Sequence, residues 1–170
     1  SMARSPRQMK PRPHVAILIE TSRSYGRGLL LGVRRYLTRH EPWSVFMELR
    51  ALDSKTPLWL KGWNGGGILT RTGTRAMAEV VRRAGVPTVE LRSPRLNPRT
   101  PWVGVDNRAM GKLVAEYLLE RGFRRFGVCE ISSEVYFEER RSNFVETVTK
   151  LGYPCSTYHA LGPPEKPAEW

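Results

Sequence analysis

Residues 101–132 read PWVGVDNRAMGKLVAEYLLERGFRRFGVCEIS, and this stretch indicates the fold class. Its first apolar run ends at Asp106 and Asn107, whose side-chain oxygens suit the free amides at a helix start. Gly122 can end that helix in the left-handed conformation, and a second apolar run follows it. The order predicts strand, helix and strand, which is one βαβ unit. The helix is expected to pack on a sheet through apolar residues at helical spacing: Met110, Leu113, Val114, Tyr117 and Leu118.

The same alternation extends over the rest of the chain. Outside the βαβ unit, strands are predicted over residues 14–20, 43–49, 67–71, 86–91 and, weakly, 156–161. Helices are predicted over residues 26–40, 74–84 and 136–151, with a short helical turn at 56–62. Such an order predicts an α/β fold, an open parallel sheet with helices on both faces. The first strand supports this, because Val15 to Ile19 is apolar throughout, as in a strand covered on both sides.

Length and composition set the domain organisation. At 170 residues the chain can bury one substantial core. Residues 1–13 combine basic residues with prolines and are expected to form a disordered basic tail, and the proline-rich residues 162–170 are expected to be a connector. We find no apolar leader, and no apolar run approaches the roughly 18 residues that span a membrane. A cytoplasmic protein without a membrane partner is therefore predicted.

The chain is strongly basic, with a formal net charge of +12. Its Lys and Arg residues are spread over several predicted helices, without the aromatic interleaving or zinc-finger spacing that organises nucleic-acid contacts. We therefore interpret them mostly as solvated surface and expect no direct DNA binding. Cys129, expected to be buried in a strand, and Cys155 form neither a disulfide framework nor a metal site, so reduced thiols and no metal or cofactor are predicted.

The order D-N-x-x-x-G-x-x-x-x-x-x-L-x-x-x-G in residues 106–122 resembles the effector domains of LacI/GalR-type sugar-responsive repressors and of periplasmic sugar-binding proteins. The resemblance extends over HVAILIE (14–20), WNGGGILTR (63–71), AGVPTVEL (84–91) and ERRSNFVETVTKLGY (139–153). Within that superfamily the chain is most similar to the sensor region of xylose-type regulators, where such a domain precedes an AraC-type DNA-binding module.

The resemblance implies one lobe of a type I periplasmic-binding-protein-like fold. Residues 14–161 would form the N-terminal lobe, and a second lobe would lie outside this chain. It further implies a small sugar bound between two lobes and controlling DNA binding by a separate domain, in a homodimer. Such a protein senses an effector and is not an enzyme.

Candidate ligand residues follow the predicted strands, because ligands of open α/β sheets bind at the carboxyl ends of the strands. Sugars need planar polar groups and aromatic faces. Glu20 and Tyr25 follow the first strand. If they do not bind ligand, Glu20 is a solvated strand end and Tyr25 packs at the start of the next helix. Arg71 follows the third strand, and Glu90 lies within the apolar run VPTVEL, where a carboxylate is costly to bury without a partner. Arg92 is a candidate for that partner.

The resemblance adds two further candidates. Arg140 leads the helix after the βαβ unit, as the sugar-clamping arginine of the family does, with an exposed helix arginine as the alternative. Asp106 either caps its helix or contacts sugar. Arg71 and Arg92 make the expected site more basic than that of the family. A sugar acid such as a uronate is therefore a candidate ligand in addition to a neutral pentose.

Two other classes of function remain open. Gly26-x-Gly28-x-x-x-Gly32 with Glu48 imitates the dinucleotide-binding fingerprint of a Rossmann-like nucleotide-dependent oxidoreductase. However, residues 20–25 separate the apolar strand from Gly26, whereas that fingerprint turns directly into its helix. A receiver-like interaction module would need an acidic cluster at its strand ends, and Glu20 stands alone at the end of the first.

Overall fold

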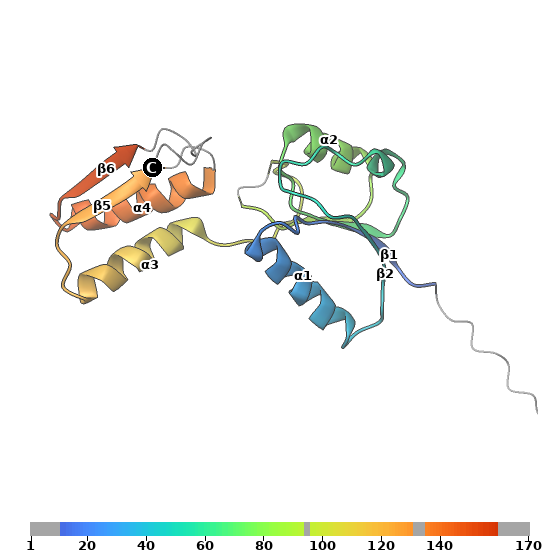
Figure 1. The fold of residues 1–170 in the computed structure, drawn as a ribbon, viewed down its shortest axis with the longest axis horizontal. Coiled ribbons are helices and arrows are strands. Elements are labelled where there is room, and N and C mark those ends of the chain that lie inside the picture. Colours follow the sequence, from blue (N-terminus) through green and yellow to red (C-terminus); the bar gives the residue numbers. More distant parts are fainter. Residues whose placement is uncertain (1–10, 94–95, 131–134, 160–170) are drawn as a thin grey trace, which may run out of the picture. The chain divides into compact units, whose positions relative to one another are not determined.

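The computed structural model describes residues 11–93, 96–130 and 135–159, and the chain divides into two compact units (Figure 1). Unit 1 is Ser1–Val103 and unit 2 is Gly104–Trp170. The predicted α/β fold with parallel strands and helices is confirmed, but the strands form two separate sheets, one in each unit, and not the single open sheet expected over residues 14–161. The connector 162–170 and most of the basic tail lie outside the described residues.

Unit 1 is built on a four-stranded sheet in the order β2-β1-β3-β4. Its strands are β1 (His14–Leu18), β2 (Ser44–Met47), β3 (Gly67–Thr70) and β4 (Thr88–Glu90), and all neighbours are parallel. The apolar run after His14 is buried throughout, as its composition predicts. The strand expected over residues 102–105 is reduced to one bridge between Glu90 and Trp102.

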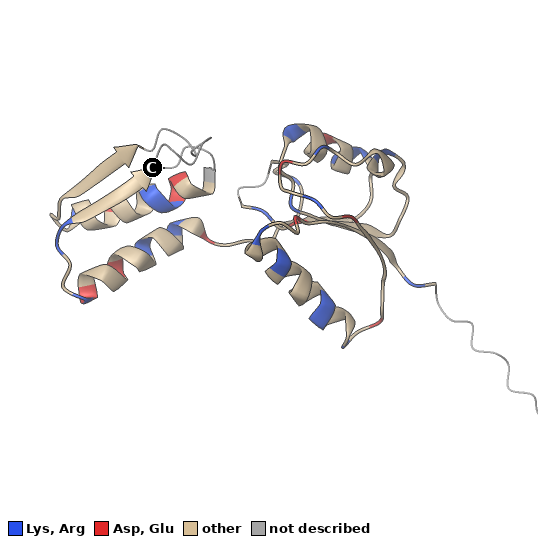
Figure 2. Ribbon diagram, in the orientation of Figure 1, with Lys and Arg blue, Asp and Glu red and all other residues tan. Residues whose placement is uncertain are grey.

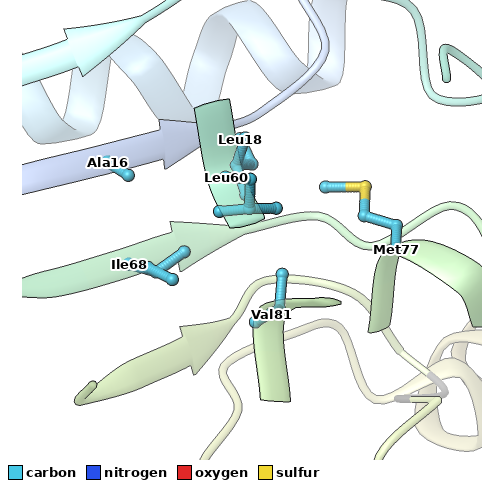
Figure 3. Close-up of a cluster of buried hydrophobic side chains, with 6 residues drawn as sticks. All are labelled: Ala16, Leu18, Leu60, Ile68, Met77 and Val81. Atoms are coloured by element: carbon cyan, nitrogen blue, oxygen red, sulfur yellow. The ribbon is translucent and has the colours of Figure 1, made fainter. Parts of the chain in front are cut away.

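Helices cover both faces of this sheet. α1 (Ser24–Leu37) lies on one side, and α2 (Arg75–Arg83) and the short 3-10 helix η1 (Leu58–Gly62) lie on the other (Figure 1). Side chains alternate along a strand, so every second residue of β1 faces the side of α2. Figure 3 shows the resulting core, which consists of Ala16, Leu18, Leu60, Ile68, Met77 and Val81.

Unit 2 contains α3 (Asn107–Glu120), β5 (Phe126–Glu130), α4 (Val135–Lys150) and β6 (Cys155–His159). β5 and β6 pair in parallel, and the two helices pack on one another. The core cluster of this unit is Ala115, Phe144 and Val148, with Phe126 and Val128 of β5 packed against it.

The apolar stripe predicted for α3 is not its buried face. Leu113, Val114 and Tyr117 are exposed, whereas Gly111 and Ala115 are buried. The reason is the close contact between α3 and α4. A side chain at Gly111 would collide with the backbone carbonyl of Arg140 in α4, so α3 packs on α4 through its small residues. Met110 is half-buried, and Leu118 packs against the core cluster.

Cys129 is exposed, contrary to the prediction. Phe126 and Val128 turn toward the helices, so the intervening residues of β5 point to the other face. Within the described residues no other element covers that face.

The basic residues are distributed over α1, α2, α3 and α4 and do not gather on one element (Figure 2). No helix in the described part of the chain is both long and apolar enough to cross a membrane.

Candidate functional site

The carboxyl ends of the four strands of unit 1 carry a set of charged and polar residues. Parallel strands place these ends along one edge of the sheet, where open α/β sheets bind ligands. We call this set the rim. It comprises Arg50 after β2, Glu20 after β1, Arg71 and Thr72 after β3, Glu90 at the end of β4, and Arg92.

Glu20 and Arg71 form a buried ion pair in the middle of the rim. The Glu20 side chain is buried, with 1% of the residue exposed, and its Oε1 accepts a hydrogen bond from Arg71 Nη1. The second oxygen, Oε2, is also buried and has no hydrogen-bond partner among the described residues. The Arg71 guanidinium carbon lies 4.8 Å from the centre of the Tyr25 ring, a cation–π contact.

Gly26 explains how α1 reaches this pair. A Cβ at Gly26 would collide with the backbone oxygen of Glu20 and approach its carboxyl carbon. The first turn of α1 therefore lies directly against the Glu20 carboxylate, which any larger residue would prevent.

Glu90 anchors the neighbouring part of the rim. It is 4% exposed, and its Oε1 accepts a hydrogen bond of 3.1 Å from the backbone amide of Thr72. Arg92 Nη1 donates to the carbonyl oxygens of Thr72 and Gly73 at 2.9 and 3.3 Å. Burial raises the pKa of Glu90, and hydrogen bonds from Thr72 and the charge of Arg92 oppose that shift. Arg92 thus acts on Glu90 through its charge and fixes the loop after β3.

Glu90 is expected to make unit 1 less stable as the pH rises. Its pKa is raised in the folded state, so the folded protein binds the proton more tightly than the unfolded chain. Stability should be greatest below the ordinary pKa of a glutamate and should fall as the pH rises toward the folded pKa. Glu90→Gln keeps an oxygen for the Thr72 amide and should flatten this dependence. Urea unfolding at a series of pH values measures it; identical profiles for both proteins would contradict the assignment.

Asp106 and Arg140 belong to unit 2. The Asp106 carboxylate accepts a hydrogen bond of 2.9 Å from the Ala109 amide, so it caps α3. Arg140 Nε donates to the side-chain oxygen of Asn107 at 2.9 Å, and the guanidinium lies 5.0 Å from the Tyr136 ring centre. Asn107 is buried and also donates to Glu139 at 3.3 Å.

Asp106→Ala should destabilise unit 2 by about 1 kcal/mol, the usual loss when a helix cap is removed. Asp106→Asn keeps an accepting oxygen and should lose only a fraction of that. Thermal unfolding of the three proteins gives the comparison. Equal losses for alanine and asparagine would show that the carboxylate charge, and not the cap, matters at this position.

The structure brings Glu20, Tyr25, Arg71 and Glu90 together along the rim, as predicted. Sequence reasoning singled out Asn107 only as a helix-start residue, and it missed three other buried polar residues: Arg50, Thr70 and Thr72. β3 ends at Thr70 and is followed by Arg71 and Thr72, so the place of Thr72 after a strand was a usable signal. The burial of Arg50 had no local signal, because an arginine that follows an edge strand is ordinarily exposed.

The glycines of the dinucleotide-like pattern do not form a phosphate-binding turn. β1 ends at Leu18 and α1 begins at Ser24, so a loop separates strand and helix. A Cβ at Gly28 or Gly32 would meet nothing within 4 Å. Glu48, the acid of that pattern, is exposed and accepts a hydrogen bond of 3.2 Å from Trp59 Nε1.

No model of a known protein family matches the chain, and no curated protein matches it either. Solved structures do match. The xylose-binding transcription activator xylR superposes with a TM-score of 0.73 at 22% identity, covering 92% of this chain and 40% of that one. A periplasmic binding protein/LacI transcriptional regulator from Alkaliphilus metalliredigens, complexed with D-xylulofuranose, gives 0.70 at 14% identity, covering 89% and 57%.

A third similar structure is a periplasmic solute-binding protein of an ABC transporter from Actinobacillus succinogenes with bound D-allose. Its TM-score is 0.69 at 17% identity, and the match covers 88% of this chain and 59% of that one. These identities are low, so the likeness concerns the fold. The chain spans about 40 to 60% of the length of these proteins and has part of the type I periplasmic-binding-protein-like α/β fold.

Proposed function

We propose that this chain is the effector-sensing part of a sugar-responsive transcription regulator, and that the rim of unit 1 binds the sugar. One observation carries the proposal. The Glu20 carboxylate is buried at the edge of the sheet where the strands have their carboxyl ends, and its Oε2 has no partner among the described residues. A carboxylate oxygen in that state needs a hydrogen-bond donor, and sugar hydroxyls are donors.

The surroundings of Glu20 suit a sugar ring. Arg71 fixes the carboxylate through Oε1, so Oε2 keeps one orientation. Tyr25 is 46% exposed and offers an aromatic surface beside the ion pair. Aromatic faces cover the apolar sides of sugar rings, while charged groups bind their hydroxyls.

Arg140 is proposed as a ligand-binding residue within unit 2. Its Nε is held by Asn107, which fixes the plane of the guanidinium. The terminal nitrogens make no hydrogen bond to the described residues and can each donate to a hydroxyl.

The finer proposal follows the resemblance and the fold neighbours, two of which are named as transcription regulators. DNA would be contacted by a separate domain, of AraC type if the chain is a xylose-type regulator. The protein would act in the cytoplasm as a homodimer and would not be an enzyme. The sugar would control DNA binding through its unequal affinity for two states of the regulator.

Thermal-shift measurements on this chain test the proposal. The ligands are D-xylose, D-xylulose, D-allose, D-xylonate and D-glucuronate, with NAD as the probe for an oxidoreductase. At a concentration about 100-fold above its Kd, a sugar stabilises by about 2.7 kcal/mol, which corresponds to roughly 5 °C or more in a chain of this size.

Glu20→Gln should remove this shift, and Arg39→Met, at an exposed position just after α1, should leave it unchanged. Stabilisation by NAD and by none of the sugars would contradict the proposal. So would a sugar shift that Glu20→Gln leaves intact.

A further inference from the structure

Arg50 is a buried cation with an unsatisfied nitrogen. The residue follows β2 at the rim and is 6% exposed. Its Nη2 lies 3.4 Å from the Ser54 carbonyl oxygen and 3.4 Å from the Met77 sulfur, and its Nη1 has no partner among the described residues. The contact with Ser54 is at the outer limit of a hydrogen bond, and the Met77 thioether sulfur is a weak acceptor, so a stronger acceptor can replace both.

No carboxylate neutralises this guanidinium within the described residues. The Glu48 side chain is exposed and engaged with Trp59, and it acts on Arg50 only through its charge. Asp53 is also exposed and forms no ion pair with Arg50 within the described residues. Burial lowers the pKa of Arg50, yet a guanidinium remains protonated at neutral pH. A charge buried in this way costs several kcal/mol unless a partner compensates it.

The first turn of α2 adds positive potential at the same place. Met77, which Arg50 contacts, is the third residue of this nine-residue helix. The Met77 amide is capped by Thr74, but the amides of Arg75 and Ala76 make no hydrogen bond to another described residue. The first turn contains no acidic residue, and it contains Arg75. Helix N-termini bind anions through such amides.

The geometry points to an oxyanion on the effector, bound by Arg50 and the first turn of α2. The effector would therefore be a sugar acid or a sugar phosphate, with its carboxylate or phosphate at Arg50 and its hydroxyls at Glu20. This inference rests on the proposed sugar-binding function and names the class of sugar. Of the acids of the rim, Glu20 pairs with Arg71 through Oε1 and keeps Oε2 for the hydroxyls, and Glu90 accepts a hydrogen bond from the Thr72 amide.

Matched ligand pairs test the inference by calorimetry at constant ionic strength. The pairs are D-xylose with D-xylonate, D-glucose with D-glucuronate, and D-glucose with D-glucose 6-phosphate, so that carboxylate and phosphate are compared separately. In the unaltered chain the charged member should bind at least tenfold more tightly. Arg50→Met should abolish that preference and keep binding of the neutral sugar. Lys55→Met is the control, because Lys55 is an exposed cation next to Ser54. Its replacement should leave the preference for the charged sugar unchanged.

The unliganded Arg50→Met protein should be at least as stable as the parent, because it no longer buries a charge without a partner. If it fails to fold, Arg50→Lys, which keeps the charge and loses the planar fork, should bind the charged sugars at least tenfold more weakly. Equal affinity within the pairs, or a preference that survives at Arg50→Met, would overturn the inference while leaving the proposed function intact. If no sugar binds, the proposed function fails, and titration with inorganic phosphate then decides whether Arg50 holds an anion.

Discussion

Arg71→Met should destabilise unit 1 by about 3 to 5 kcal/mol and abolish sugar binding. The replacement leaves the Glu20 carboxylate buried without the cation that now pairs with it. Removing one partner of a buried ion pair has this large effect because the remaining charge stays in a poorly solvated place. Urea unfolding gives the loss of stability, and calorimetry with the sugar panel gives the loss of binding.

The double change Glu20→Gln with Arg71→Met is the control for this prediction. It removes both charges, so most of the stability should return, whereas sugar binding should not. Such a separation would assign the pair both a structural and a binding role. A single Arg71→Met protein within about 0.5 kcal/mol of the parent would contradict the buried ion pair.

Gly111→Ala should separate α3 from α4 and destabilise unit 2 by about 1 to 3 kcal/mol or more. The added methyl group would collide with the Arg140 carbonyl and crowd the Phe144 amide. Both are backbone groups of a helix, which cannot move aside as a flexible side chain can. The hydrogen bond between Asn107 of α3 and Arg140 of α4 should break when the two helices move apart.

Gly32→Ala in α1 is the matched control for Gly111→Ala. A Cβ at Gly32 meets nothing within 4 Å, so the change should be neutral or stabilise the helix by up to about 1 kcal/mol. Hydrogen exchange read by mass spectrometry locates the effect. Gly111→Ala should reduce amide protection in α3 and α4; protection there equal to that of the parent would contradict the close crossing.

Unit 1 was largely predictable because its signals are local. The apolar run Val15 to Ile19 identifies a strand buried on both faces, and turn residues mark the ends of the helices. Once the strands are known to be parallel, their carboxyl ends must meet at one edge. Glu20, Arg71 and Glu90 could therefore be placed together before any coordinates.

The rest depends on contacts between distant parts of the chain. Apolar periodicity shows that α3 is a helix, but it does not reveal that Gly111 faces α4 and that Leu113 faces solvent. Residue patterns along β5 likewise do not say whether both of its faces are covered, which is why Cys129 was misplaced. The burial of Arg50 depends in part on α2, whose Met77 contacts its guanidinium from a distant part of the sequence.

Titration of isotopically labelled chain with the sugar panel, followed by amide chemical shifts, tests the central claim most directly. The account predicts saturable shifts at the rim, with the amides of Glu20, Tyr25 and Thr72 among the most affected. Saturable shifts that avoid the rim, or no shift with any sugar of the panel, would contradict it.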